Sequence, residues 1–115
     1  MTNQKVFDME FARIYGLLVQ KVERKGRMKS ELDFAIKWLT GYGDDGLQKQ
    51  IDDSVTLETF FANAPAINPN AHLIKGTICG CKIEDIADPL MKKIRQMDKL
   101  ADDLAKGKSL DKICP

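Results

Sequence analysis

The chain has 115 residues, of which 43 % are hydrophobic and 30 % are charged. This length is typical of one domain and the apolar fraction supports a hydrophobic core, so residues 1–115 are expected to form a single folded domain. The formal net charge of +1 argues against strong bulk attraction to nucleic acid or to a membrane surface. The longest clean apolar run, residues 17–19, is far shorter than a membrane span, so we expect no membrane partner.

Cysteine content and the first residues of the chain bear on its compartment. The three cysteines, Cys79, Cys81 and Cys114, are an odd number, which argues against a secreted disulfide framework. The first residues contain no apolar signal-peptide core. We therefore expect a cytoplasmic protein.

The first predicted helix runs from about Asp8 to Lys25. Asp8 is its expected N-cap, and Gly26 is expected to end it. The apolar side chains recur at steps of three and four residues, which places them on one helical face. They are Phe7, Phe11, Ile14, Leu18 and Val22.

Three shorter helices are predicted in the middle of the chain. A capping box formed by Ser30 and Asp33 is expected to open the first of them, which residues 40–43 should end. Asp44 is expected to cap the second helix and Thr56 the third, because short oxygen-bearing side chains accept hydrogen bonds from the first free backbone N–H groups.

Residues 64–83 carry weaker signals. The segment 64–70 is rich in proline and asparagine and is predicted to be a loop. Residues 72–83 contain two glycines and several β-branched residues, which is compatible with a short extended segment or with a helical turn followed by a loop. The sequence leaves these two alternatives open.

The clearest predicted element follows Asp88, the expected N-cap. Pro89 occupies the first helical position, where its missing N–H costs nothing. The helix is expected to continue to Lys106 and to end at Gly107, and Ser109 is expected to cap a last turn. Its apolar residues follow helical spacing and are Leu90, Ile94, Met97, Ala101 and Leu104.

Together these elements predict an all-α, compact bundle of five or six helices. The first helix, the helix near residues 30–40 and the last long helix are expected to enclose one core. The expected core members are Phe11, Leu18, Leu32, Ile36, Trp38, Phe60, Leu90, Ile94 and Met97.

Several separated segments, in order along the chain, resemble the bacterial family called domain of unknown function 2200. They are residues 20–27, 38–42, 60–65, 68–70, 73–76, 78–80, 88–91, 98–100 and 105–108. The resemblance spans nearly the whole chain. It implies a small, mostly helical bacterial protein, and it implies no catalytic or binding residue, because the family has no established activity or ligand.

Cys79, Cys81, Cys114 and His72 are the candidate metal ligands or catalytic groups. Zinc prefers four nitrogen or sulfur ligands, typically from Cys-x-x-Cys pairs, and Cys79 and Cys81 are one residue too close for such a pair. His72 is a candidate base for Cys79, but no residue pattern marks an oxyanion hole. We therefore assign no catalytic, cofactor-binding or metal-ligating residue, and keep an enzyme or metal site that uses Cys79 and His72 as a minor alternative.

Basic residues gather towards both ends of the chain. Residues 1–30 carry a net charge of +4, residues 31–90 of −6, and residues 91–115 of +3. A helix-turn-helix in the middle is disfavoured, because its second helix, 44–53, has four carboxylates that would oppose phosphates. The remaining alternative is weak, non-specific nucleic-acid binding by basic residues of the first and last helices, namely Arg13, Lys21, Arg24, Lys25, Lys92, Lys93 and Arg95.

The function remains unknown at this stage. The leading hypothesis is a non-enzymatic interaction or structural protein of the bacterial cytosol with an unknown protein partner, and no cofactor is expected. The apolar face of the last long helix is equally compatible with core packing and with a homodimer seam, so a homo-oligomer is a further alternative.

Overall fold

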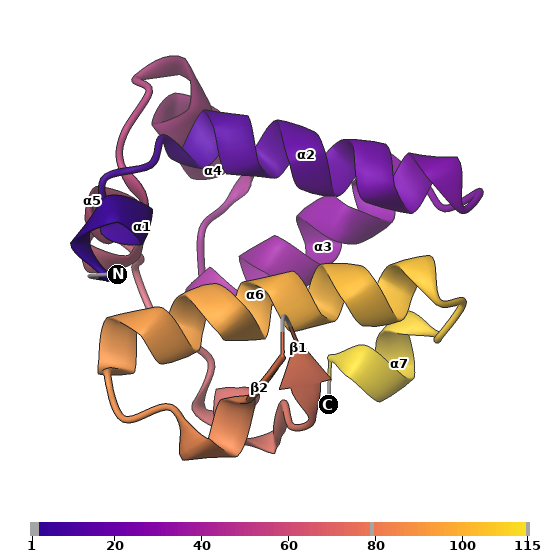
Figure 1. Cartoon of the computed structure of the whole chain (residues 1–115). Coiled ribbons are helices and arrows are strands. Elements are labelled where there is room, and N and C mark those ends of the chain that lie inside the picture. The colour runs from indigo at the N-terminus through magenta and orange to yellow at the C-terminus, as the bar shows by residue number, and fades with distance from the viewer. Residues whose placement is uncertain (1–2, 79, 115) are drawn as a thin grey trace.

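The longest helix, α6 (Pro89–Ala105), runs through the centre of the molecule. The computed structural model describes residues 3–78 and 80–114. Helix α2 (Phe11–Arg24) packs along one side of α6, and the small β-hairpin and α7 (Leu110–Ile113) pack along the other (Figure 1). Helix α3 (Lys29–Thr40) contacts both α2 and α6.

The remaining elements are short and lie around this centre. In the part of the chain that the structure describes there are seven α-helices, two 3₁₀-helices and one two-stranded antiparallel hairpin. The elements not yet named are α1 (Gln4–Phe7), α4 (Asp44–Asp52), α5 (Leu57–Ala62), η1 (Pro69–Leu73), β1 (Thr77–Ile78), β2 (Cys81–Lys82) and η2 (Ile83–Asp85). The predicted, predominantly helical fold is confirmed, and the described part of the chain has one α-helix more than the expected five or six because α1 is a separate short helix.

The start of α6 follows the prediction closely. The side chain of Asp88 accepts a hydrogen bond from the Met91 N–H at 2.9 Å, and Pro89 occupies the first turn. The last helical residue is Ala105, one before the expected end at Lys106.

Helix α2 begins at Phe11, three residues later than predicted, and Asp8 is the C-cap of α1 instead of an N-cap. Between the two helices the chain is extended at Glu10, which forms a β-bridge with Thr56. The Phe11 N–H donates to Val55 O at 2.8 Å. The pairing of residues 10 and 11 with residues 55 and 56 therefore delays the start of α2. The spacing of apolar residues in the sequence gives no sign of this pairing.

Helix α3 begins at Lys29, and the predicted capping box of Ser30 and Asp33 is wrong. The N-cap is Met28, whose N–H donates to the Glu31 carboxylate at 3.1 Å. Gly41 ends the helix with φ +81°, and a Cβ at this position would lie 2.7 Å from Ala66 O. Glycine is therefore required there both by backbone conformation and by close packing.

Of the two predicted caps that follow, the cap of α4 is wrong and the cap of α5 is confirmed. The N-cap of α4 is Gly43, and the predicted cap Asp44 is the first helical residue. The hydroxyl of Thr56 accepts a hydrogen bond from the Thr59 N–H at 3.1 Å, as expected for the cap of α5.

The segment with the weakest sequence signal contains both of the structures that the sequence left open. Part of the predicted loop is helical, because η1 starts at Pro69. Strands β1 and β2 then pair antiparallel with Thr77 opposite Lys82, and η2 follows directly. Cys79, between the two strands, lies outside the described residues.

Most of the predicted core is buried. Phe11 and Phe60 stack with ring centroids 3.7 Å apart. Trp38 and Leu90 are only partly buried, although both pack against the core. The other seven expected members, Phe11, Leu18, Leu32, Ile36, Phe60, Ile94 and Met97, are buried.

Replacement of Ile94 by alanine should destabilise the fold by about 2–5 kcal/mol, because it leaves a cavity where α6 is enclosed. Ile94 is only 2 % exposed. The measurement is urea unfolding followed by circular dichroism. The control is Leu17→Ala on the outer face of α2, where the residue is 53 % exposed and the expected change is within about 0.5 kcal/mol. Equal effects of the two substitutions would contradict the central position of Ile94.

Candidate ligand-binding site

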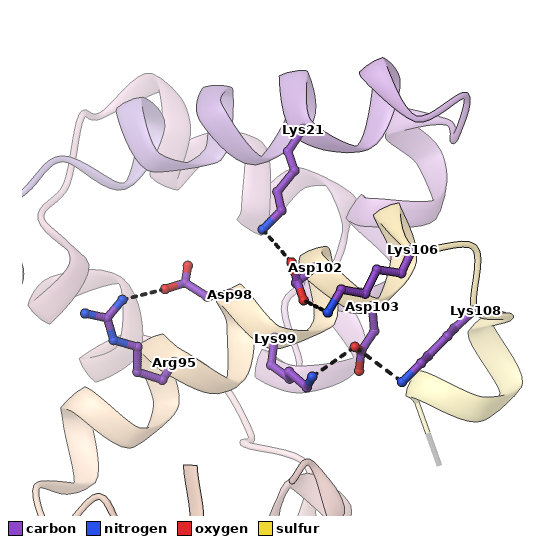
Figure 2. A network of polar contacts seen from close by, with 8 residues as sticks. All are labelled: Lys21, Arg95, Asp98, Lys99, Asp102, Asp103, Lys106 and Lys108. Atoms are coloured by element: carbon purple, nitrogen blue, oxygen red, sulfur yellow. Dashed lines mark hydrogen bonds and ion pairs between the residues drawn. The ribbon is translucent and has the colours of Figure 1, made fainter. Parts of the chain in front are cut away.

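Charged side chains along α6 form three sets of ion pairs, which we call together the α6 ion-pair network (Figure 2). It comprises Lys21, Arg95, Asp98, Lys99, Asp102, Asp103, Lys106 and Lys108. Lys21 reaches down from α2 to Asp102 at 3.1 Å, and Lys106 approaches the same carboxylate at 2.9 Å. These contacts fasten α2 to α6.

The second half of the network is more deeply buried. Lys99 and Asp103 are each 9 % exposed, and their charged atoms lie 3.1 Å apart. The Lys99 stem packs against Gly76, where a Cβ would lie 3.2 Å from Lys99 Cε. Lys108 approaches Asp103 at 3.5 Å. Each carboxylate of this network thus already holds one or two cations of the protein, so we assign the network a structural role.

Burial and ion pairing shift the pKa values of these carboxylates in opposite directions. Burial raises the pKa of Asp98 above its ordinary value, although Arg95 at 3.0 Å lowers it in part. For Asp102 burial also raises the pKa, but hydrogen bonds from Lys106 and Lys21 outweigh it and leave the pKa below its ordinary value. The ionised form of Asp98 is therefore disfavoured in the fold, and that of Asp102 is favoured.

A second cluster joins α2, α3 and α4 around a cavity of about 200 Å³. The Tyr15 hydroxyl donates to Asp33, and Lys29 contacts the other oxygen of that carboxylate at 2.8 Å. Burial and the bond to Asp33 raise the pKa of Tyr15 to about 12. Asp44 on the rim pairs with Lys37. The charges of this cavity neutralise one another, and the phenol stays protonated, so the cluster offers neither a nucleophile nor a free charge.

A third site lies between η1 and the first half of α6, and we call it the η1–α6 pocket. Its volume is about 250 Å³, and its wall consists of Ile67, Ala71, His72, Pro89, Lys92, Lys93 and Gln96. The four α6 residues are spaced i, i+3, i+4 and i+7, so they share one face of the helix. Neither Lys92 nor Lys93 forms an ion pair with any residue that the structure describes.

Two hydrogen bonds fix the polar wall of the η1–α6 pocket. Gln96 is 4 % exposed, and its Nε2 donates to Ala71 O at 3.2 Å. His72 Nδ1 lies 2.7 Å from Pro69 O. Because a carbonyl oxygen only accepts, His72 Nδ1 is the donor in this contact. The pocket is thus lined by two lysine side chains, an amide and an imidazole beside the apolar side chains of Ile67, Ala71 and Pro89.

The cysteine and histidine candidates from the sequence are only partly placed. Cys81 is exposed on β2, and Cys114 is half-buried beyond α7, where burial raises the pKa of its thiol to about 11. His72 belongs to the η1–α6 pocket. Among residues 3–78 and 80–114, no three His, Cys, Asp or Glu side chains are grouped to hold a metal ion. Cys79 lies outside that part of the chain.

The basic residues considered for nucleic-acid binding are divided between different environments. Lys21 and Arg95 are engaged by Asp102 and Asp98. Lys92 and Lys93 face the η1–α6 pocket. The other three, Arg13, Arg24 and Lys25, lie exposed on α2 or at its end. No helix within the described ranges is long and apolar enough to cross a membrane.

The raised pKa of Asp98 has a consequence for stability. An acid whose pKa is higher in the folded state favours folding below its unfolded pKa and loses that contribution as pH rises through the folded value. Asp98→Asn should therefore gain stability relative to the wild type as pH rises from the acid range, where the carboxyl is protonated in both states, to neutral pH.

Urea unfolding at several pH values measures this difference. Asp111→Asn is the control, since Asp111 is exposed on α7 and forms no ion pair with the described residues. A relative loss of stability in Asp98→Asn as pH rises would show that attraction to Arg95 outweighs burial.

The comparisons with known proteins agree on the relationship of this chain. The crystal structure of the uncharacterized protein SP1917 is similar, with a TM-score of 0.91 and 43 % sequence identity over 98 % of this chain and 92 % of that chain. No curated protein matches. A family model described as "Uncharacterized protein conserved in bacteria (DUF2200)" matches residues 5–115. The resemblance seen in the sequence is thus confirmed, and the chain belongs to this family of uncharacterised bacterial proteins.

Proposed function

We propose that this protein is a non-enzymatic binding protein of the bacterial cytosol, and that its ligand is an organic carboxylate held in the η1–α6 pocket. The observation that carries the proposal is the contrast between two sets of cations on one helix. The lysines of the α6 ion-pair network are engaged by carboxylates, whereas Lys92 and Lys93 have none within the described chain. Two unpaired ammonium groups beside an apolar floor suit an anion with an apolar group.

The size of the pocket supports a small ligand group. A water molecule occupies about 30 Å³ in the liquid, so a volume of about 250 Å³ holds roughly eight atoms of that size. Pockets for drug-sized molecules start at about 300 Å³. The fit is therefore to a single acid with a short aliphatic group, and not to a nucleotide.

The chemistry of two described nucleophiles, Tyr15 and Cys114, supports binding without catalysis. The Tyr15 phenol is hydrogen-bonded to Asp33, and its pKa of about 12 keeps it protonated at neutral pH. The Cys114 thiol is likewise protonated, with a pKa of about 11. An activated nucleophile instead needs a lowered pKa or an adjacent base.

The test is a titration of ¹⁵N-labelled protein with 4-methylpentanoate, followed by amide chemical shifts. We expect saturable shifts around residues 67–72 and 89–96. Lys92→Met combined with Lys93→Met should weaken binding about tenfold or more, because two charge-assisted contacts are lost.

The matched control combines Lys25→Met with Lys112→Met. It removes the same net charge from two exposed lysines outside the pocket, which form no ion pair with described residues. We expect this control to bind like the wild type. Equal weakening in both double variants, or shifts spread evenly over all lysines, would mean that general charge attraction and not the pocket holds the acid.

Nucleic-acid binding is the alternative that a direct experiment must exclude. The pairing of Lys21 and Arg95 weighs against a continuous basic face, so we expect no micromolar binding of duplex DNA at 150 mM salt. Fluorescence anisotropy with labelled duplex and single strands makes this measurement. Micromolar binding that is lost on charge reversal at Arg24 and Lys92 would replace the carboxylate proposal.

A further inference from the structure

We infer that the ligand of the η1–α6 pocket is the C-terminal residue of a polypeptide, with an aliphatic side chain. In this assignment Lys92 and Lys93 hold the terminal carboxylate, the apolar floor holds the side chain, and Gln96 Oε1 accepts the N–H of the last peptide bond. The inference rests on the proposed function and narrows its ligand class.

Gln96 carries the first step. Its amide orientation is determined, because Ala71 O can only accept and must therefore face Nε2. This leaves Oε1 as an acceptor that no described residue supplies with a donor. Gln96 is also more than nine-tenths buried and forms part of the pocket wall. Gln96 thus offers an amide acceptor to the pocket that it lines, and a ligand that brings an N–H gains a hydrogen bond there.

The shared pocket supplies the second step. Gln96, Lys92 and Lys93 lie at i+4, i and i+1 on α6 and line the same pocket. The acceptor and the two lysine side chains therefore border one volume. A carboxylate and an N–H on the same carbon atom, as in an amino-acid residue, match this arrangement.

The charge of the pocket favours a ligand with an acylated nitrogen over a ligand with a free amino group. No Asp or Glu belongs to the wall of the described pocket. The ammonium group of a free amino acid would approach two lysines and would find no carboxylate. An amide N–H carries no charge, so the C-terminal residue of a peptide fits and a free amino acid does not. Capture of a C-terminal carboxylate is a known mode of peptide recognition.

Two buried polar groups elsewhere in the described chain do not point to a ligand. Gln50 Oε1 has no hydrogen-bond donor among the described residues, and Asp103 Oδ1 is held by the ion pairs with Lys99 and Lys108. Neither residue lines the η1–α6 pocket or the cavity beside Tyr15. Among these three residues Gln96 alone is placed at a pocket with unpaired cations.

The experiment compares ligands that differ by one group each, titrated by NMR as above. N-acetyl-leucine offers the carboxylate, side chain and N–H, 4-methylpentanoate lacks the N–H, and N-acetyl-leucinamide lacks the carboxylate. We expect N-acetyl-leucine to bind about three- to tenfold more tightly than 4-methylpentanoate, which is the effect of one hydrogen bond. N-acetyl-leucinamide and free leucine should bind more weakly than N-acetyl-leucine.

Two further measurements test the role of Gln96. Gln96→Met should reduce N-acetyl-leucine to the affinity of 4-methylpentanoate and leave the latter unchanged. N-acetyl-N-methyl-leucine, which has no N–H, should lose the same advantage on the wild-type protein, so the test does not depend on the folding of the variant. A tripeptide ending in leucine should bind like N-acetyl-leucine, and its C-terminal amide should not.

The outcomes separate the two proposals. Equal binding of both carboxylates, still dependent on Lys92 and Lys93, would overturn the peptide inference and leave the carboxylate pocket intact. Tighter binding of free leucine than of N-acetyl-leucine would also overturn it. Absence of binding by every carboxylate would overturn both proposals.

Discussion

The enclosure of α6 determines how the rest of the structure is organised. Neighbouring helices and the hairpin cover this helix, and most of its side chains from Met91 to Ala105 are buried. A charge in such a position must be paired, because its desolvation is otherwise uncompensated. Asp98, Asp102 and Asp103 meet this requirement with five cations of the same chain. The many cations around α6 are therefore explained by the need to pair its buried carboxylates, and they do not by themselves indicate catalysis.

The charges of α6 are treated differently along its length. Towards the C-terminus, the carboxylates Asp98, Asp102 and Asp103 are paired with cations of the same chain. Near the N-terminus, Lys92 and Lys93 line the η1–α6 pocket and find no carboxylate within the described chain. The positive end of the helix dipole adds to the potential on this side. The proposed binding site therefore lies where the cations of α6 are not neutralised by the fold.

Sequence reasoning succeeded where local chemistry decides the structure. The Asp88 cap, the Thr56 cap and the burial of Ile94 follow from residue type and spacing. It failed where a distant segment determines the local structure, because the pairing of Glu10 with Thr56 delays the start of α2. The pocket was missed for the same reason, since η1 must fold back onto α6 to form it. The i, i+3, i+4, i+7 spacing of Pro89, Lys92, Lys93 and Gln96 was nevertheless visible and marks its α6 face.

The segments through which the sequence resembles its family have roles in the fold. Arg27 donates to Leu104 O and Lys108 O, each at 2.9 Å, and also binds Glu31, so one side chain ties the start of α3 to the end of α6. Gly41 permits the contact with the backbone of Ala66. The resemblance to the family at such positions is therefore explained by their roles in packing. The proposed ligand is instead inferred from the cations that packing leaves without a carboxylate, and among the described residues of α6 these are Lys92 and Lys93, which line the η1–α6 pocket.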